Sequence, residues 1–161
     1  MEKLRQLVRH FIRWDHPGYR FAAKVLDLIS LISSQSLKTT IDFQRMKSVS
    51  GNNSAQCINF ECLDYPFYIR PGTWDLSVAM NNFVRQEYGA VLPPAQPFTF
   101  VDGGAYTGDV SAYFLSLYPE MKVIALEPMD DSYKLAVINL RPYGNRVDLR
   151  KCCLSFDGKP V

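Results

Sequence analysis

The chain has 161 residues, of which 47% are hydrophobic and 13% aromatic, and this length can bury one sizeable core. The formal net charge of +2 is unevenly placed, because residues 1–50 carry nine Lys or Arg against four Asp or Glu and residues 51–161 carry nine against twelve. A basic arm of this kind can meet a membrane surface or an acidic partner, but is more often a solvated helical surface, and we expect no nucleic-acid partner.

No segment is long and apolar enough to span a bilayer. The longest apolar run, residues 21–32, is interrupted by Lys24 and Asp27 and is shorter than the roughly 20 residues that a spanning helix needs. Arg5, Arg9 and Arg13 are spread through the apolar positions of the N-terminal segment, which is not the pattern of a signal peptide. The sequence therefore predicts a cytoplasmic protein without a transmembrane segment.

The cysteines Cys57, Cys62, Cys152 and Cys153 form no C-x-x-C pair, and no histidine lies at ligand spacing from them. A zinc site is therefore not expected. Because Cys152 and Cys153 are adjacent in an apparent strand, we interpret them as small buried hydrophobic residues with reduced thiols.

The first 97 residues predict helices followed by a β-hairpin. Apolar residues at helical spacing indicate one amphipathic helix near residues 4–12 and a second over residues 19–33. The GNNS turn at residues 51–54 indicates a hairpin between residues 40–50 and 55–63, and residues 66–70 form a strand that pairs with residues 58–63. A helix capped by Thr73 or Asp75 should then run to about Tyr88, before a stiff proline-rich linker over residues 89–97.

From Phe98 onward the pattern becomes strand, helix, strand, helix, strand, which is the order of an α/β unit with a parallel sheet. The strands are expected over residues 98–101, 122–126 and 147–154, and the helices over residues 109–118 and 132–140. We therefore divide the chain into a basic helical segment (1–50), a hairpin and helix leading into the core (51–97), and a Rossmann-like cofactor-binding half (98–161).

The residues that carry chemistry lie where the first two of these strands end. Asp102, Gly103, Gly104 and Gly108 lead from strand to helix, and such a glycine loop lets a ligand approach bare backbone N–H groups. Glu127, followed by Pro128, ends the second strand, where a carboxylate can accept hydrogen bonds from both hydroxyls of a ribose. The arrangement predicts a site for an adenosine-bearing cofactor.

Three cofactor classes can be compared at this loop. A P-loop is excluded because Asp109, and not Lys, follows Gly108. A dinucleotide fingerprint would have glycine at 103, 105 and 108, and Ala105 breaks it, so an NAD-dependent oxidoreductase half stays an alternative. S-adenosylmethionine has a cationic sulfur, an ammonium group and no pyrophosphate, which suits a loop flanked by Asp102 and Asp109.

Three successive segments, FVDGGAYTGDVSAYF, VIALEPMDDSYKLAVINL and VDLRKCCLSFDGKP, resemble the FkbM-type family of class I methyltransferases that use S-adenosylmethionine. The upstream segment YIRPGTWDLSVAMNNFVRQEYG is also similar to the family, so the resemblance covers roughly residues 66–161. It implies methyl transfer to a hydroxyl of a small molecule, glycan or lipid. By this resemblance the cofactor-binding residues are Asp102, Gly103, Gly104, Ala105, Tyr106, Gly108, Glu127 and Pro128.

The chain departs from the family in two ways. Tyr106 stands where class I enzymes often have Gly and this family often has Asn, so it could stack on the cofactor, narrow the pocket or simply pack. The later strands of a class I sheet, which carry much of the acceptor pocket, do not follow, so no catalytic base can be named. We expect a fragment whose open sheet edge is covered by a missing C-terminal half or by an oligomer. A non-catalytic interaction module stays a further alternative.

Overall fold

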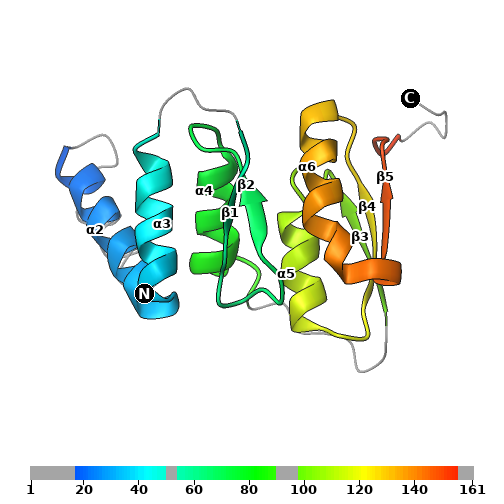
Figure 1. Ribbon diagram of the computed structural model, residues 1–161, viewed down its shortest axis with the longest axis horizontal. Coiled ribbons are helices and arrows are strands. Elements are labelled where there is room, and N and C mark those ends of the chain that lie inside the picture. Colours follow the sequence, from blue (N-terminus) through cyan, green and yellow to red (C-terminus); the bar gives the residue numbers. More distant parts are fainter. Residues whose placement is uncertain (1–16, 50–53, 90–97, 156–161) are drawn as a thin grey trace.

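The computed structural model describes residues 17–49, 54–89 and 98–155. The helix predicted over residues 4–12 and almost all of the proline-rich linker lie outside them. Figure 1 shows the elements in successive layers, from the helix pair α2 and α3, through α4 and the hairpin β1–β2, to α5 and α6 and finally the sheet β3–β4–β5. The sheet and the helix pair thus form opposite ends of the molecule.

Helices α2 (Pro17–Ser34) and α3 (Leu37–Lys47) pack side by side. The first confirms the helix predicted over residues 19–33. The prediction of a hairpin strand over residues 40–50 is wrong, because Ser36 caps α3 by accepting a hydrogen bond from the Thr39 backbone amide. Phe43 and Met46 then fall on the buried face at helical spacing.

The hairpin consists of β1 (Gln56–Ile58) and β2 (Phe67–Ile69), which pair antiparallel with Ile58 opposite Phe67. The predicted pairing is confirmed in part: β2 lies within the predicted residues 66–70, but β1 ends at Ile58, so residues 59–63 belong to the connecting loop. Asn139 holds β2 against the α/β unit, since its side chain accepts a hydrogen bond from the Tyr68 amide at 2.7 Å and donates one to the Tyr68 carbonyl at 3.0 Å. The same amide group donates to the Thr107 carbonyl, so one buried side chain joins β2 to the predicted cofactor loop.

The helix after the hairpin starts as α4 (Asp75–Ala79) and continues as a π-helix, η1 (Met80–Val84). The prediction that Thr73 or Asp75 caps this helix is wrong, because the cap residue is Trp74, whose side chain makes no capping hydrogen bond. The Thr73 hydroxyl does accept a hydrogen bond from the Asp75 amide, one residue before the cap. The wider turn closes with a hydrogen bond from the Arg85 amide to the Met80 carbonyl. It leaves Asn82, Phe83 and Val84 all buried, a run that a regular α-helix does not place on one face.

The C-terminal part is mixed α/β, with a parallel sheet in the order β3–β4–β5. Strand β3 (Thr99–Gly103) leads into α5 (Asp109–Leu117), β4 (Lys122–Leu126) into α6 (Asp130–Leu140), and the 3-10 helix η2 (Arg141–Arg146) into β5 (Val147–Arg150). This succession is the one predicted, and it is compatible with a partial Rossmann-like fold.

The third strand is shorter than predicted. The Cys152 amide bonds back to the Arg150 carbonyl, which turns the backbone and ends the pairing with β4. Cys152 is therefore half-buried and Cys153 exposed, so the interpretation of both as buried strand residues is wrong. The four cysteines are free thiols.

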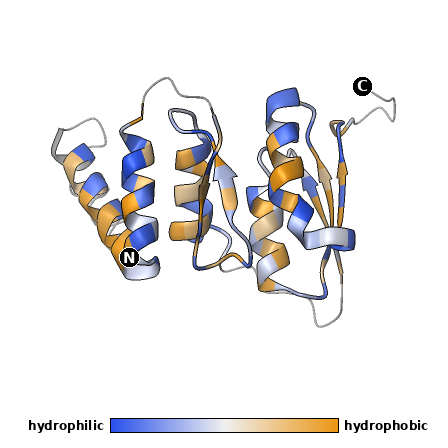
Figure 2. Ribbon diagram, in the orientation of Figure 1, coloured by the Kyte–Doolittle hydropathy of each residue, from blue (hydrophilic) through white to orange (hydrophobic). Residues whose placement is uncertain are grey.

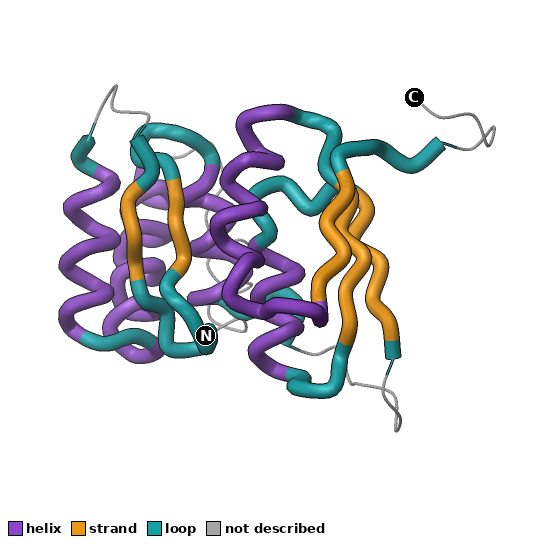
Figure 3. The backbone as a smooth tube through the Cα atoms, turned by 45° about the vertical axis from the view of Figure 1, so that its right-hand side comes forward, coloured by secondary structure: helices purple, strands orange, loops and turns teal. Residues whose placement is uncertain are grey.

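Both helices of the α/β unit cover the same face of the sheet (Figure 3), and no described element covers the other face. Val123 and Ala125 of β4 point into the core between sheet and helices, whereas Val101 of β3 is 53% exposed. Aromatic contacts tie the layers together, with Phe83 of η1 against Phe60 and Phe67. No helix among the described residues is long and apolar enough to cross a membrane.

Candidate cofactor site

The predicted site residues come together where β3 and β4 end. The two strands are parallel neighbours, with Asp102 opposite Ala125 and Gly103 opposite Leu126. Their carboxyl ends therefore meet at one edge of the sheet, which places Asp102 and Glu127 on adjacent strand ends. Both carboxylates are largely buried, at 8% and 5% exposure.

The loop from Gly104 to Gly108 folds back over the end of β4. The amides of Gly104 and Ala105 both donate to the Leu126 carbonyl at 2.9 Å, and the amide of Tyr106 donates to Glu127 Oε2 at 2.8 Å. The loop therefore lies across the strand end.

The other oxygen of Glu127 also accepts a backbone hydrogen bond. Pro128 has no N–H to offer, so Met129 provides the next amide, which donates to Glu127 Oε1 at 2.8 Å. A carboxylate oxygen has two acceptor sites, so each oxygen of Glu127 retains one for a ligand. Glu127 thus shapes the loop and can still accept hydrogen bonds from a diol.

Each loop glycine meets a different requirement. A Cβ at Gly103 would lie 2.5 Å from Leu154 Cδ1, and one at Gly108 would lie 2.8 Å from Leu140 Cγ. Gly104, at a φ of +106°, has no atom within 4 Å of the place where a Cβ would stand. Gly108 therefore serves close packing against the buried Leu140, whereas Gly103 meets only the end of the exposed Leu154 side chain, which can move aside. Gly104 leaves open space beside bare backbone, as a bound ligand requires. Ala105 is buried, and its methyl group belongs to the core.

Carboxylates occupy the N-terminal end of α5. Asp102 accepts a hydrogen bond from the Ser111 hydroxyl at 2.6 Å, and burial raises the pKa of Asp102 while its hydrogen bonds with Ser111 act to lower it. Asp109, the first residue of α5, accepts hydrogen bonds from Asn82 Nδ2 and from the Thr107 hydroxyl. Burial raises the pKa of Asp109 to about 6, with a further increase from the charge of Asp102. Two acids at a helix N terminus already complement its dipole and would repel a pyrophosphate placed there.

A network that the sequence did not reveal supports the loop from the other side. Asp75 forms two hydrogen bonds with the Arg70 guanidinium, at 2.9 and 3.0 Å, and accepts a third from the Tyr106 hydroxyl at 2.6 Å. Burial alone would raise the pKa of Asp75, but the hydrogen bonds from Arg70 and Tyr106 outweigh it and lower that pKa. Burial and the bond to Asp75 together raise the pKa of Tyr106 to about 12.

The same network explains the conformation of Tyr106, which has a φ of +50°. Its amide is bound to Glu127 and its hydroxyl to Asp75, so the residue spans the loop from one carboxylate to the other. Arg70 lies over its ring, 5.7 Å from the centroid. In the structure, Tyr106 packs against Arg70 and forms hydrogen bonds with Glu127 and Asp75, which corresponds to the packing role considered for it. In the sequence, Arg70 and Asp75 stand close together in the segment YIRPGTWD, which could have indicated their ion pair. Tyr106 lies 31 residues after Asp75, so its hydrogen bond to that carboxylate cannot be predicted from a local pattern.

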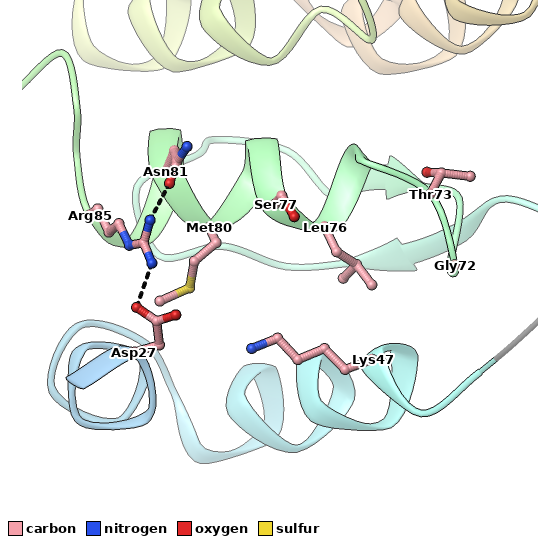
Figure 4. Close-up of a pocket in the computed structure, with 9 residues that line it drawn as sticks. All are labelled: Asp27, Lys47, Gly72, Thr73, Leu76, Ser77, Met80, Asn81 and Arg85. Atoms are coloured by element: carbon pink, nitrogen blue, oxygen red, sulfur yellow. Dashed lines mark hydrogen bonds and ion pairs between the residues drawn. The ribbon is translucent and has the colours of Figure 1, made fainter. Parts of the chain in front are cut away.

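A separate pocket of about 360 Å³ lies between the helix pair and α4–η1 (Figure 4). Its lining shares no residue with the loop or with Glu127, and consists of Asp27, Lys47, Gly72, Thr73, Leu76, Ser77, Met80, Asn81 and Arg85. An ion pair of 2.6 Å between Asp27 and Arg85 joins its two sides. The pocket is therefore distinct from the candidate cofactor site.

The architecture of the site is thus an acid and a glycine loop at the end of β3, tied to an acid at the end of β4. Comparisons with protein-family models, with curated proteins and with solved structures give no match to this chain.

Proposed function

We propose that this chain is the cofactor-binding part of an S-adenosylmethionine-dependent methyltransferase that acts on a hydroxyl oxygen. The observation that carries the proposal is the pair of buried acids, Asp102 and Glu127, on adjacent strand ends beside the open space at Gly104. Asp102 is suited to the ammonium group of the cofactor, and Glu127 retains acceptor sites for its ribose hydroxyls. Gly104 lets the ligand approach the backbone closely.

The acids at the start of α5 favour this cofactor over a dinucleotide. Asp102 and Asp109 accept hydrogen bonds at the helix end on which a dinucleotide would rest its pyrophosphate. A sulfonium cofactor brings positive charge to the same place and has no pyrophosphate. The cofactor supplies an electrophilic methyl group, and the contribution of the chain is to hold it in position for an acceptor oxygen. That the acceptor is a small molecule, a glycan or a lipid rests on the family resemblance alone.

Calorimetric titration with S-adenosylhomocysteine tests the proposal on a sample that shows cooperative thermal unfolding. We expect saturable binding, with affinity about tenfold or more lower in Asp102→Asn, because the isosteric amide keeps the Ser111 hydrogen bond but loses the charge. Asp148→Asn, which removes an exposed acid from β5 at the other edge of the sheet, is the matched control and should bind like the parent.

A parallel titration with NAD separates the alternatives. Binding of NAD without S-adenosylhomocysteine would replace the proposal by an oxidoreductase half. A folded sample that binds neither ligand would leave the chain as a non-catalytic module, and equal affinities for Asp102→Asn and Asp148→Asn would remove the assigned role of Asp102.

A further inference from the structure

Helix α2 has an outer face made of large apolar side chains. Phe21, Val25, Leu28 and Ile32 recur at intervals of three and four residues, and Ile29 lies beside them. All five are exposed, and Phe21 and Ile32 reach 71% and 61%. We call these five residues the outer face of α2. They are a contiguous set on one helix, which is more apolar surface than scattered exposed residues produce.

The opposite side of α2 faces the protein. Leu26, Ser30 and Leu31 are buried there, and Asp27 forms its ion pair with Arg85 of the segment after η1. Figure 4 shows Asp27 directed from α2 toward Arg85, and Figures 1 and 2 show α2 as the end layer of the molecule, with strongly hydrophobic residues along it. The packing of α2 is therefore satisfied on its inner side, and no other described element lies against the outer face.

The charges beside the outer face are positive. Arg20 and Lys24 are exposed on α2 and border the apolar stripe on one side. Among the described residues of α2 the single acid is Asp27, which the ion pair with Arg85 holds on the inner side. Along the sequence, residues 1–50 have a net charge of +5. An apolar stripe bordered by Arg and Lys is the arrangement of helices that lie in the surface of an anionic bilayer.

We propose that the outer face of α2 binds the surface of an anionic lipid bilayer, with the helix axis in the membrane plane. Phe21 and the aliphatic side chains enter the boundary between headgroups and acyl chains, while Arg20 and Lys24 contact the lipid phosphates. A helix of 18 residues extends about 27 Å, which sets the largest length of the contact. A second copy of the chain fits this face less well, because it would bring no acid to pair with Arg20 and Lys24: the one acid among the described residues of α2, Asp27, is already bonded to Arg85.

Vesicle flotation with the full chain tests the proposal. We expect flotation with vesicles of phosphatidylcholine mixed with phosphatidylglycerol, little with phosphatidylcholine alone, and a decrease as salt is added. Phe21→Gln/Ile32→Gln should lower the partition about tenfold or more, and Arg20→Gln/Lys24→Gln should remove the preference for anionic lipid. The matched controls are Val137→Gln/Ile138→Gln and Lys122→Gln/Lys134→Gln, which alter exposed residues of α6 and the sheet side and should float like the parent.

Failure of the parent to float, or equal flotation of the Phe21→Gln/Ile32→Gln and Val137→Gln/Ile138→Gln variants, would overturn the proposal. Analytical ultracentrifugation tests whether a second copy of the chain binds the outer face of α2 instead. If the parent is a dimer that does not bind vesicles, and Phe21→Gln/Ile32→Gln converts it to a monomer, the proposal is overturned in favour of self-association. If the Phe21→Gln/Ile32→Gln variant does not unfold cooperatively, the Arg20→Gln/Lys24→Gln variant provides the test. The proposal is then refuted if this variant floats with anionic vesicles as well as the parent does.

Discussion

Glu127 Oε2 accepts a hydrogen bond from the backbone amide of Tyr106 at 2.8 Å, so the end of β4 holds the loop that leaves β3. Because Glu127 Oε1 binds the Met129 amide as well, both oxygens of one buried carboxylate are needed by the backbone. The acid predicted to contact a cofactor is therefore also a structural part of the loop.

Replacing Glu127 by Gln should destabilise the fold by about 1–3 kcal/mol, because the amide nitrogen must then face one of two backbone N–H donors. Urea denaturation gives the free energy of unfolding. Glu120→Gln, at an exposed position before β4, is the control and should change it by less than about 0.5 kcal/mol. Equal losses in the two variants would contradict the structural role of Glu127.

The stability of the protein should depend on the protonation of Asp109. Its pKa is raised from an ordinary 3.8 to about 6, so between these values the folded state holds a proton that the unfolded state has released. The free energy of unfolding then decreases as pH rises from about 4 to about 6, and Asp109 adds no further change above that. The total is roughly 2–3 kcal/mol at about 1.4 kcal/mol per pKa unit.

Asp109→Asn isolates this contribution, because the Asn82 amide can turn to offer its oxygen to the new side chain. Its stability relative to the parent should increase as pH rises from 4 to 6, and other titrating groups cancel in that difference. A difference that is constant across the range would show that Asp109 titrates at an ordinary value.

Tyr106→Phe should cost about 1–2 kcal/mol of stability, because it removes the hydroxyl that donates to buried Asp75. Tyr133→Phe on α6 is the matched control, since its hydroxyl has no hydrogen bond to another described residue. Guanidinium denaturation measures both. An unchanged midpoint for Tyr106→Phe would mean that Arg70 alone satisfies Asp75.

Gly108→Ala should destabilise the fold by more than Gly104→Ala. Both residues have positive φ, so both alanines are strained, but only the Cβ at 108 would meet the buried Leu140 side chain, at 2.8 Å. We expect a loss of about 1 kcal/mol at 104 and about 3 kcal/mol at 108. Thermal unfolding ranks the two. In a double-mutant cycle with Leu140→Ala, which removes Cγ and both Cδ atoms, Gly108→Ala should cost less than it does in the parent; an equal cost in both backgrounds would rule out the contact as its cause.

The α/β unit was predictable because its signals are local. Residues 123–126 form one continuous apolar run, and β4 has the predicted bounds, Lys122–Leu126. Glu127 was identified from its place directly after that run. Helix α3 was missed because the GNNS turn drew the interpretation toward a hairpin, whereas the deciding contact is the Ser36 cap, 15 residues before that turn.

The support of the loop was not predictable for a different reason. Asp75 reaches Tyr106 across 31 residues, and Asn139 reaches Tyr68 across 71. Neither pairing leaves a periodic pattern, because each is made by the packing of elements and not by their internal spacing. Such polar residues look like ordinary helix-cap or helix-surface residues until the fold brings their partners to them.

The π-turn at Met80–Val84 determines how the protein would respond to the deletion of a single residue from this helix. A π-turn contains one residue more than the α-turn that could replace it. Deleting one residue there would let a regular helix form, yet the part of the chain before the deletion would rotate relative to the part after it. The Asn82 side chain would then move away from Asp109, and this buried carboxylate at the start of α5 would lose the hydrogen bond that Asn82 donates. The additional residue of this π-turn thus connects the hairpin side of the protein to the protonation of Asp109 at the start of α5.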